Sequence, residues 1–337
     1  MLSQGGKAPF LLQPVGKDYL WGGDKLKREY GKDLDMDPLA ESWECSTHPD
    51  GTNRVATGRH RGELLSDVLR DHPEYLGTHP RMDEKGGLPI LVKFIDAKKD
   101  LSVQVHPDDA YAAKYENGSR GKSEMWYVMD ADEGSAIIYG FYEDTTKEKV
   151  RDAIRKGTIL NLVQRIPIHR NDVFFIEAGT VHAIPAGALI AEIQESSNLT
   201  YRLYDYGRVD KNGKERPLHI DRAMDVADLK SAASPRQPMR LLRYERGCAT
   251  ELLCRCRYFQ TERMLVNAGE GSTGSAAPVP FSSDRNSFRI LLCLAGAGTL
   301  RSGEEKLEFS AGGCIFVPAD LQGMELEGRL ELLNITC

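Results

Sequence analysis

Four polar side chains, set at strand-like spacing, could together hold a divalent metal ion. In LSVQVHPDD (101–109), alternation places Gln104 and His106 on one face of a predicted strand and the apolar side chains on the other. Two strand residues span roughly 6.6 Å, so both side chains can reach one ion at the ~2.0 to 2.2 Å bonds of nitrogen and oxygen ligands. Glu124 opens a later strand, and His182 closes a turn after a further one. Two histidines, a carboxylate and an amide are typical of an open catalytic site for zinc or a similar ion.

Each of these side chains also has an ordinary structural interpretation. A single inward histidine is more often a hydrogen-bonded core residue, and a Gln or Glu at a strand start more often lies at a solvated rim. The four together, in order and at these spacings, favour one metal ion per chain, and zinc suits the donors. The remaining histidines lie in loop or helix contexts and are interpreted as surface or packing residues.

Positively charged residues accompany the proposed ligands. Lys93 lies within the apolar run ILVKFI, where an inward cation is costly unless it is paired or used, so it is expected to line a pocket. Lys122 precedes Glu124 by two residues, and Arg202 follows His182 by twenty. On spacing alone, Lys122 and Arg202 fit an ordinary surface position equally well.

The elements that must position these residues are mostly β-strands. Runs rich in β-branched and aromatic residues recur at 88–95, 101–106, 124–129, 135–141, 172–178, 188–195, 288–296 and 312–319. Many short strands punctuated by Gly, Asp and Asn predict a mainly β fold, a barrel or sandwich rather than a parallel α/β sheet.

Helices are predicted as inserts between these strands. Apolar residues recur at helical spacing in 63–77, 145–157 and 219–230. A capping box from Thr145 to Glu148 and a terminal Gly157 mark the ends of the second.

Two stretches of the chain echo one another, which predicts a duplicated domain. NDVFFIEAGTVHAI (171–184) is matched by AGGCIFVPADLQGMEL (311–326), which offers Asp320 and Gln322 but has no histidine in place of His182. The Ser-, Ala- and Pro-rich segment 231–240 is predicted as a linker, with the boundary near residue 235. We therefore expect a metal-binding domain over 1–235 and a C-terminal barrel over 241–337 that binds no metal.

The composition argues against several partners. The chain has 337 residues and a net charge of −6, so neither nucleic acid nor an anionic membrane is expected as a partner. The seven cysteines are an odd number without the spacing of a disulfide framework, which indicates reduced thiols. No apolar leader or long apolar stretch is found, so a cytoplasmic protein is predicted.

Several motifs resemble those of the type I mannose-6-phosphate isomerases in their short bacterial form. The matching pieces are WGGDKL (21–26), ESWECSTHPDG (41–51), LPILVKFIDAKKDLSVQVHPDDAYA, GKSEMWYVM, AGTVHAI, ALIAEIQESSNLTYRLYDYGR and RPLHIDRA. They occur in the family's order from about residue 9 to 225. Glu177 stands where the family pattern has proline, and RND replaces its usual GD lead-in, which affects loop geometry and none of the proposed ligands.

The resemblance implies two cupin-like (jelly-roll) β-barrels with inserted helices and a zinc-dependent conversion of mannose 6-phosphate to fructose 6-phosphate. By resemblance, Gln104, His106, Glu124 and His182 are the zinc ligands. The same comparison assigns substrate and phosphate contacts to Lys93, Ser102 and Lys122, and catalysis to Arg202.

The chemistry favours a cis-enediol route, in which a base moves a proton between C2 and C1 of the sugar. The ion would polarise the substrate oxygens, and Arg202 could stabilise the same developing charge. The proton carrier stays open between Lys122 and a water on the ion. Quaternary structure stays open between monomer and homodimer.

Two other functions are compatible with a metal site on this fold. One is a sugar-binding bicupin without turnover, although a purely structural zinc site is normally closed and rich in cysteine. The other is a metal-dependent cupin oxygenase. An amide ligand in place of a third imidazole, with cations nearby, suits a phosphorylated substrate better than a redox iron.

Overall fold

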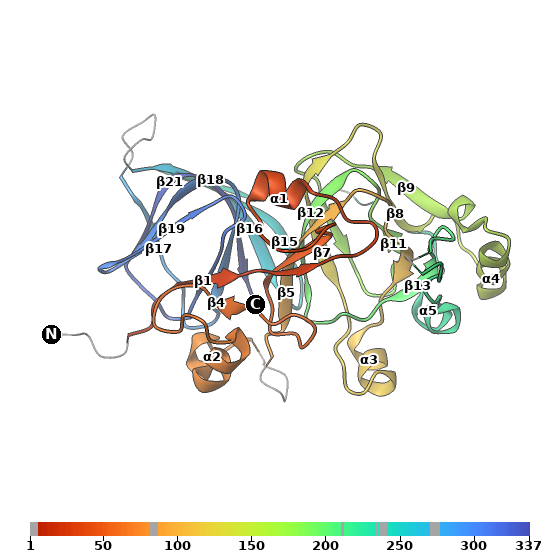
Figure 1. The fold of residues 1–337 in the computed structure, drawn as a ribbon, viewed down its shortest axis with the longest axis horizontal. Helices are drawn as coiled ribbons and strands as arrows, with labels where there is room; N and C mark the ends of the chain where they lie inside the picture. Colours follow the sequence, from red (N-terminus) through yellow and green to blue (C-terminus); the bar gives the residue numbers. More distant parts are fainter. Residues whose placement is uncertain (1–5, 81–86, 210–211, 234, 236–240, 270–276) are drawn as a thin grey trace.

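Strands dominate the structure, which confirms the predicted mainly β class. The computed structural model describes residues 6–80, 87–209, 212–233, 235, 241–269 and 277–337. Within these ranges the strands form three sheets, of six, five and ten strands (Figure 1). Whether the sheets close into two complete barrels stays a prediction.

The first two sheets come from residues 15–204 and lie face to face. The six-stranded sheet runs in the order β10 (Val173–Ile176), β7 (Glu124–Ala131), β12 (Ala188–Glu195), β5 (Ile90–Ala97), β3 (Glu41–Cys45), β2 (Val15–Lys17). The five-stranded sheet runs in the order β13 (Tyr201–Tyr204), β6 (Val103–Val105), β11 (His182–Ala183), β8 (Ala136–Phe141), β9 (Val163–Pro167). A shared apolar cluster that includes Ile95, Trp126 and Ile137 packs between them.

The outer face of each sheet is covered by a different partner. Helices α4 (Lys147–Arg155) and α5 (Ile220–Val226) pack on the five-stranded sheet through a cluster that includes Val105, Val150 and Ala223. The six-stranded sheet turns its other face, with Val92, to the C-terminal sheet in the largest cluster. Because successive strand residues face opposite ways, these two packings fix which residues point between the sheets.

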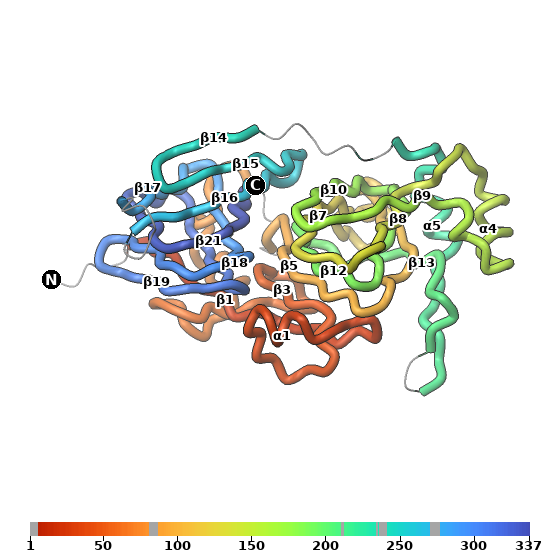
Figure 2. Tube along the Cα trace, turned by 90° about the horizontal axis from the view of Figure 1, so that it is seen from above, coloured from red at the N-terminus to blue at the C-terminus, as the bar shows by residue number. Residues whose placement is uncertain are grey.

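The ten-stranded sheet contains strands from both the N-terminal and the C-terminal part of the chain. Its C-terminal strands are β14 (Leu242–Glu245), β15 (Cys248–Arg255), β16 (Gln260–Ala268), β17 (Val279–Phe281), β18 (Arg289–Ser302), β19 (Glu305–Ser310), β20 (Cys314–Val317) and β21 (Met324–Thr336). The N-terminal strands β1 (Phe10–Gln13) and β4 (Arg54–Val55) extend it, with β1 antiparallel to β20. Figure 2 shows the N-terminal segment running along both halves of the molecule.

A division of the chain near residue 235 therefore does not separate the sheets cleanly. Residues 10–13 and 54–55 precede the predicted boundary yet hydrogen-bond within the C-terminal sheet. Long-range pairing of this kind leaves no local signal in a sequence. Most of the predicted linker, residues 234 and 236–240, lies outside the described part of the chain.

Each of the eight predicted strand runs overlaps an observed strand, although β5, β7 and β18 continue beyond the predicted ends and other observed strands were not predicted. The three predicted helices are observed with shorter ends. The helical stretch at 63–77 divides into α2 (Leu65–Asp71) and a 3-10 turn at Pro73–Tyr75. Helices α1 (Lys25–Tyr30) and α3 (Asp109–Tyr115) were not predicted because each is too short to show helical periodicity.

The two echoing segments adopt the same local backbone. Both contain a strand, β10 or β20, followed three residues later by a residue with positive φ: Gly179 at +94° and Asp320 at +61°. This shared turn supports the predicted duplication. Only the first copy places a histidine, His182, after the turn.

The cap of α4 lies one residue later than predicted. Thr146, not Thr145, is the N-cap, and its hydroxyl accepts a hydrogen bond from the backbone N–H of Lys149 at 3.2 Å. The backbone N–H of Thr145 is instead held by the carbonyl of Leu229, which keeps that residue outside the helix.

We expect Thr146→Ala to lower the free energy of unfolding by about 1 kcal/mol, because an N-terminal N–H loses its acceptor. Thr145→Ala is the matched control and should cost clearly less, since its hydroxyl oxygen has no hydrogen-bond partner among the described residues. Urea denaturation of both variants measures the difference. Equal losses would contradict the assigned cap.

Candidate metal centre and active site

The space between the five- and six-stranded sheets collects the polar residues singled out in the sequence. On β6 and directly before and after it, Ser102, Gln104 and His106 face inward while Val103 and Val105 pack outward against the helices. Across the space, Glu124 leads β7 on the same face as Trp126, which packs in the shared cluster. Strand alternation therefore places polar side chains opposite one another in an otherwise apolar layer.

Three ligand atoms converge within this layer. The Nε2 atoms of His106 and His182 lie 3.5 and 3.4 Å from the carboxylate oxygens of Glu124. One ligand atom from each of the three residues falls within 4.8 Å of the others, and each residue is at most 1% exposed. Such spacing is what three ligands around one small cation require.

Hydrogen bonds at the far side of each imidazole select the tautomer that a metal needs. Nδ1 of His106 lies 2.7 Å from the carbonyl oxygen of Leu199, and Nδ1 of His182 lies 2.8 Å from that of Thr180. A carbonyl accepts only, so Nδ1 carries the proton and Nε2 keeps its lone pair facing Glu124. The donor set therefore fits a divalent ion such as zinc.

Burial reinforces the neutral state of both rings. Burial, with the neighbouring Lys122 ammonium as the next cause, holds the pKa of His106 well below its usual value. Burial likewise lowers the pKa of His182 to about 4. Neutral imidazole is the form that ligates metal, so neither ring must first lose a proton at neutral pH.

Gln104 lies beside these three residues as the possible fourth ligand. Its Nε2 is 3.3 Å from Nε2 of His182, and its Oε1 accepts a hydrogen bond from the hydroxyl of Ser102 at 3.3 Å. A half-turn of the amide exchanges the two atoms without moving the side chain and would point the oxygen at the ion site. Oxygen is the amide atom that ligates metals, so this rotation accompanies any role of Gln104 as a ligand.

Two buried lysines lie among buried carboxylates next to the metal site. Lys122 Nζ is 2.6 Å from Glu124, 3.1 Å from Nε2 of His106 and 3.4 Å from Glu192. Lys93 Nζ contacts Glu192 at 3.0 Å and Glu41 at 3.4 Å. Lys93 is thus the inward cation that the sequence predicted, and Lys122 is buried rather than a surface residue.

Glu192 connects the two lysines and was not predicted from the sequence. Burial raises the pKa of its carboxyl, but the ammoniums of Lys122 and Lys93 outweigh burial and bring the pKa well below its usual value. Glu192 is therefore ionised and bridges two cations. A charged residue inside the apolar strand ALIAEIQE (188–195) was the available signal.

Arg202 stands on the opposite wall, in register with Gln104 on the neighbouring strand. Its Nε donates to the hydroxyl of Ser102 at 3.3 Å and its Nη1 to the carbonyl of Pro217 at 3.0 Å. The backbone of Arg202 is held by His219, whose Nδ1 accepts from its N–H at 3.2 Å. Both acceptors of the guanidinium are neutral, so its charge stays available.

A second arginine on this wall, Arg216, had no signal in the sequence. It donates twice to Asp205, at 2.7 and 2.6 Å, and Arg208 pairs with the same carboxylate. Three arginines with one aspartate leave this wall with a net positive charge.

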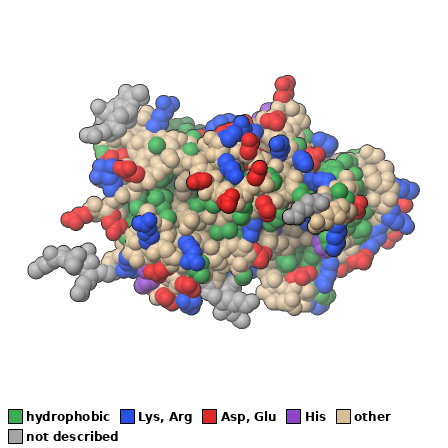
Figure 3. Space-filling view, in the orientation of Figure 1, with side chains coloured by type: hydrophobic (Ala, Val, Ile, Leu, Met, Phe, Trp, Pro, Cys, Tyr) green, Lys and Arg blue, Asp and Glu red, His purple; other side chains and the backbone are tan. Residues whose placement is uncertain are grey.

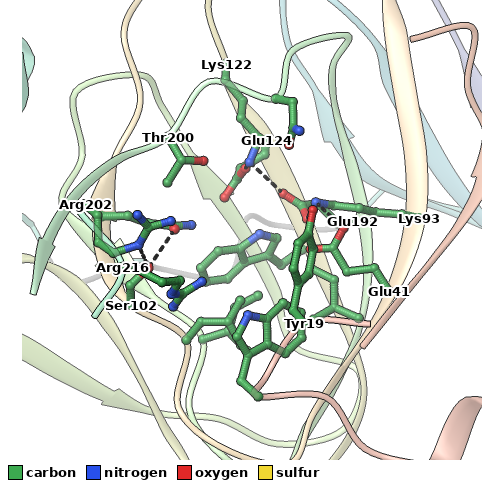
Figure 4. A pocket seen from close by; sticks show the side chains of 17 residues that line it. Tyr19, Glu41, Lys93, Ser102, Lys122, Glu124, Glu192, Thr200, Arg202 and Arg216 are labelled. Carbon is green, nitrogen blue, oxygen red and sulfur yellow. Dashed lines mark hydrogen bonds and ion pairs between the residues drawn. The ribbon is translucent and has the colours of Figure 1, made fainter. Parts of the chain in front are cut away.

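A cavity of about 230 Å³ lies between these groups, and its lining includes Gln104, Lys122 and Glu124 (Figure 4). Ser102, Arg202 and Arg216 lie on one side of it, and Lys93, Glu192 and Glu41 on the other. The lining also includes Tyr19, Trp21, Trp126, Asn198 and Thr200, none of which was predicted as a site residue. His106 and His182 are not part of this lining, but both lie within 3.5 Å of Glu124, which is.

Behind the site, the pKa of Glu195 is raised to about 8 by burial and by the neighbouring Asp109 carboxylate. Its Oε1 accepts from the backbone N–H of Ser123 at 2.8 Å, next to Glu124. Between pH 4.5 and 8 the folded chain therefore binds one more proton here than the unfolded chain, and its stability falls as pH rises through that window.

We expect Glu195→Gln to raise the free energy of unfolding by about 1 to 3 kcal/mol at pH 8. The gain should shrink towards pH 4.5, because glutamine keeps the hydrogen bond from Ser123 without an ionisable group. Denaturant unfolding at several pH values measures both curves. Parallel curves for the two proteins would show that Glu195 does not titrate as assigned.

The surface and the helices add two further facts. On the face in Figure 3, acidic and basic side chains are interspersed. No helix in the described ranges has the length and apolar character needed to cross a membrane.

Comparisons with known proteins agree with this geometry. Residues 10–138 match the family model of the phosphomannose isomerase type I catalytic domain, and residues 276–337 match that of the mannose-6-phosphate isomerase cupin domain. The chain is 34% identical to a mannose-6-phosphate isomerase of Streptococcus mutans over 96% of its own length and 97% of that protein. A Bacillus subtilis relative named mannose-6-phosphate isomerase is also 34% identical, over 96% of this chain and 98% of its own.

Solved structures show the same fold. The crystal structure of the mannose 6-phosphate isomerase from Bacillus subtilis superposes with a TM-score of 0.88 at 31% identity, covering 98% of this chain and 99% of that one. A phosphomannose isomerase mutant from Salmonella typhimurium gives a TM-score of 0.74 at 16% identity, over 97% and 98% of the two chains, which supports the fold alone.

Fold and site together define a cupin-type enzyme with a candidate metal centre in a charged pocket between two sheets. The chain belongs to the type I phosphomannose isomerase family, with that family's mannose-6-phosphate isomerase activity.

Proposed function

We propose that the chain is a zinc-dependent isomerase that interconverts mannose 6-phosphate and fructose 6-phosphate through a cis-enediol. The observation that carries the zinc requirement is the convergence of two neutral imidazole Nε2 atoms and one carboxylate at the wall of the charged cavity. His106, Glu124 and His182 would hold the ion, with Gln104 as the fourth ligand. Bound there, the ion supplies a Lewis acid that polarises the substrate oxygens.

Lys122 is our candidate for the group that moves the proton between C2 and C1. It is the only lysine among the described residues that contacts both a proposed ligand imidazole and the Glu124 carboxylate. A carrier in this position lies within reach of the carbon atoms next to the polarised oxygens.

Arg202 is proposed to stabilise the negative charge that develops on the enediolate. Its hydrogen bond to Ser102, which in turn bonds Gln104, fixes the guanidinium beside the ligand set. A preorganised donor of this kind acts where charge appears during the reaction.

The substrate phosphate is proposed to bind at Arg216 and Ser102, on the side of the cavity that also carries Arg202. Lys93, for which a phosphate contact was predicted, is already paired with Glu192 and Glu41, and a dianion beside it would also meet those carboxylates. Lys93 and Glu192 are instead suited to the sugar hydroxyls. The net positive charge around Arg216 favours the phosphate.

A coupled assay of fructose 6-phosphate formation, with and without a chelator, tests the proposal. We expect the chelated protein to lose activity, to keep its circular dichroism spectrum, and to recover on addition of zinc. Activity that resists complete metal removal would contradict the zinc requirement. A zinc-loaded protein that binds mannose 6-phosphate without turnover would indicate a sugar-binding protein, and oxygen consumption would indicate an oxygenase.

A further inference from the structure

One face of the ten-stranded sheet is apolar over most of its length and becomes polar towards one end. Met264, Leu291 and Leu332 belong to the apolar cluster on this face. Glu262, Arg289 and Asn334 lie two residues before or after them on β16, β18 and β21, and therefore point the same way. Three polar side chains thus occupy positions where the alternation otherwise places core residues.

These side chains border a cavity of about 580 Å³ that is separate from the active site. Its lining also includes Thr250, the ring of Phe281 and the exposed Arg243. Its lining is mostly polar, and a cavity of this size in which several polar groups converge can hold a small polar molecule. No residue of this cavity lines the active-site pocket.

Two side chains of this lining, Asn334 and Arg289, each have one buried polar atom without a partner among the described residues. Asn334 is 3% exposed, and its Nδ2 donates to Glu262 Oε2 at 3.1 Å, which fixes the orientation of the amide. Its Oδ1 then faces away from Glu262 and, within the described ranges, accepts no hydrogen bond. Nε of Arg289 is also buried without an acceptor among those residues.

The arginine is partly buried, and its guanidinium contacts the ring of Phe281 rather than a carboxylate. Burial lowers the pKa of Arg289, and no ion pair of Arg289 occurs in the described part of the chain. A partly desolvated cation without an ion pair and a buried amide oxygen without a donor both cost folding free energy. An anion bound in the cavity beside the Arg289 guanidinium would offset part of the cost of desolvating it.

We propose that this cavity is a second binding site, for a small hydroxylated anion of the sugar-acid or sugar-phosphate class. Arg289 binds the anionic group, while the Glu262 carboxylate, oriented by Asn334, accepts hydrogen bonds from hydroxyl groups. The Arg289 guanidinium lies over the ring of Phe281, 5.7 Å from its centroid, which holds it at the cavity wall. The arginine disfavours a metal cation in the same place.

Isothermal titration with 6-phosphogluconate tests the site, because this probe carries both anionic groups and hydroxyls but no carbonyl to isomerise. We expect Arg289→Met to bind one equivalent fewer than the wild type, or to bind it roughly tenfold or more weakly. Arg243→Met is the matched control: it removes a charge from the same cavity, but from a side chain 67% exposed and paired with Glu245. It should bind as the wild type does, and both variants should keep the wild-type kcat.

A stability measurement separates loss of the site from loss of the fold. Because Arg289→Met removes a partly desolvated cation without an ion pair and keeps an apolar contact with Phe281, its Tm without probe should equal or exceed that of the wild type. Gluconate and inorganic phosphate, titrated separately, show whether the carboxylate or the phosphate supplies the anion. Equal stoichiometry and affinity in wild type and Arg289→Met would overturn the proposal, as would an equal loss of binding in Arg243→Met.

Discussion

His182→Ala is expected to release the metal ion and to lower kcat/KM by about a thousandfold or more. The ion's stabilisation of charge on the substrate is worth several kcal/mol, and each 1.36 kcal/mol corresponds to about a tenfold change in rate. The imidazole is completely buried, its Nδ1 is held by the Thr180 carbonyl, and its Nε2 faces Glu124. Removing the ring leaves two of the three converging ligand atoms.

Metal analysis and steady-state kinetics measure this effect. His169→Ala is the control, because the side chain of this histidine is 79% exposed. Among the described residues, Asp172 is its only ion-pair partner. The control should keep both metal and activity. Full metal content in His182→Ala would remove this residue from the ligand set, and a collapsed circular dichroism spectrum would assign it a structural role.

Arg202→Lys is expected to lower kcat by about a hundredfold, or about 2.7 kcal/mol, with KM little changed. Lysine keeps the positive charge but presents one compact group in place of a planar fork of donors. Arg202 uses two of its nitrogens on Ser102 and Pro217 at the same time, which a lysine cannot reproduce. An interaction made only with the enediolate affects kcat rather than KM.

Arg216→Lys is the companion variant on the same wall. If Arg216 binds the phosphate in the ground state and in the transition state alike, its replacement should raise KM and leave kcat nearly intact. Kinetics with mannose 6-phosphate compare the two variants. A raised KM with unaltered kcat in Arg202→Lys would move Arg202 to the phosphate site, and unaltered constants in both would exclude both assignments.

The sequence by itself determined which side chains face the site. Alternation along LSVQVHPDD and along β7 assigned Gln104, His106 and Glu124 to inward faces, and a lysine within an apolar run marked Lys93. These inferences needed only the two-residue period of a strand, which is a local property of the backbone. The mainly β class and the inserted helices followed from the same local patterns.

Only the tertiary structure decided which of these strand faces meet and which carboxylates pair with the buried lysines. Glu192 and Glu41 come from strands on either side of Lys93 in the sheet, far from one another in the chain. Strand order is set by long-range hydrogen bonding, so no local pattern could show that Lys93 and Lys122 share Glu192 as a partner. For the same reason, no local pattern could show that β1 and β4 join the C-terminal sheet. Nor could it show that several arginines gather around Arg216, or that polar side chains line one end of the second cavity.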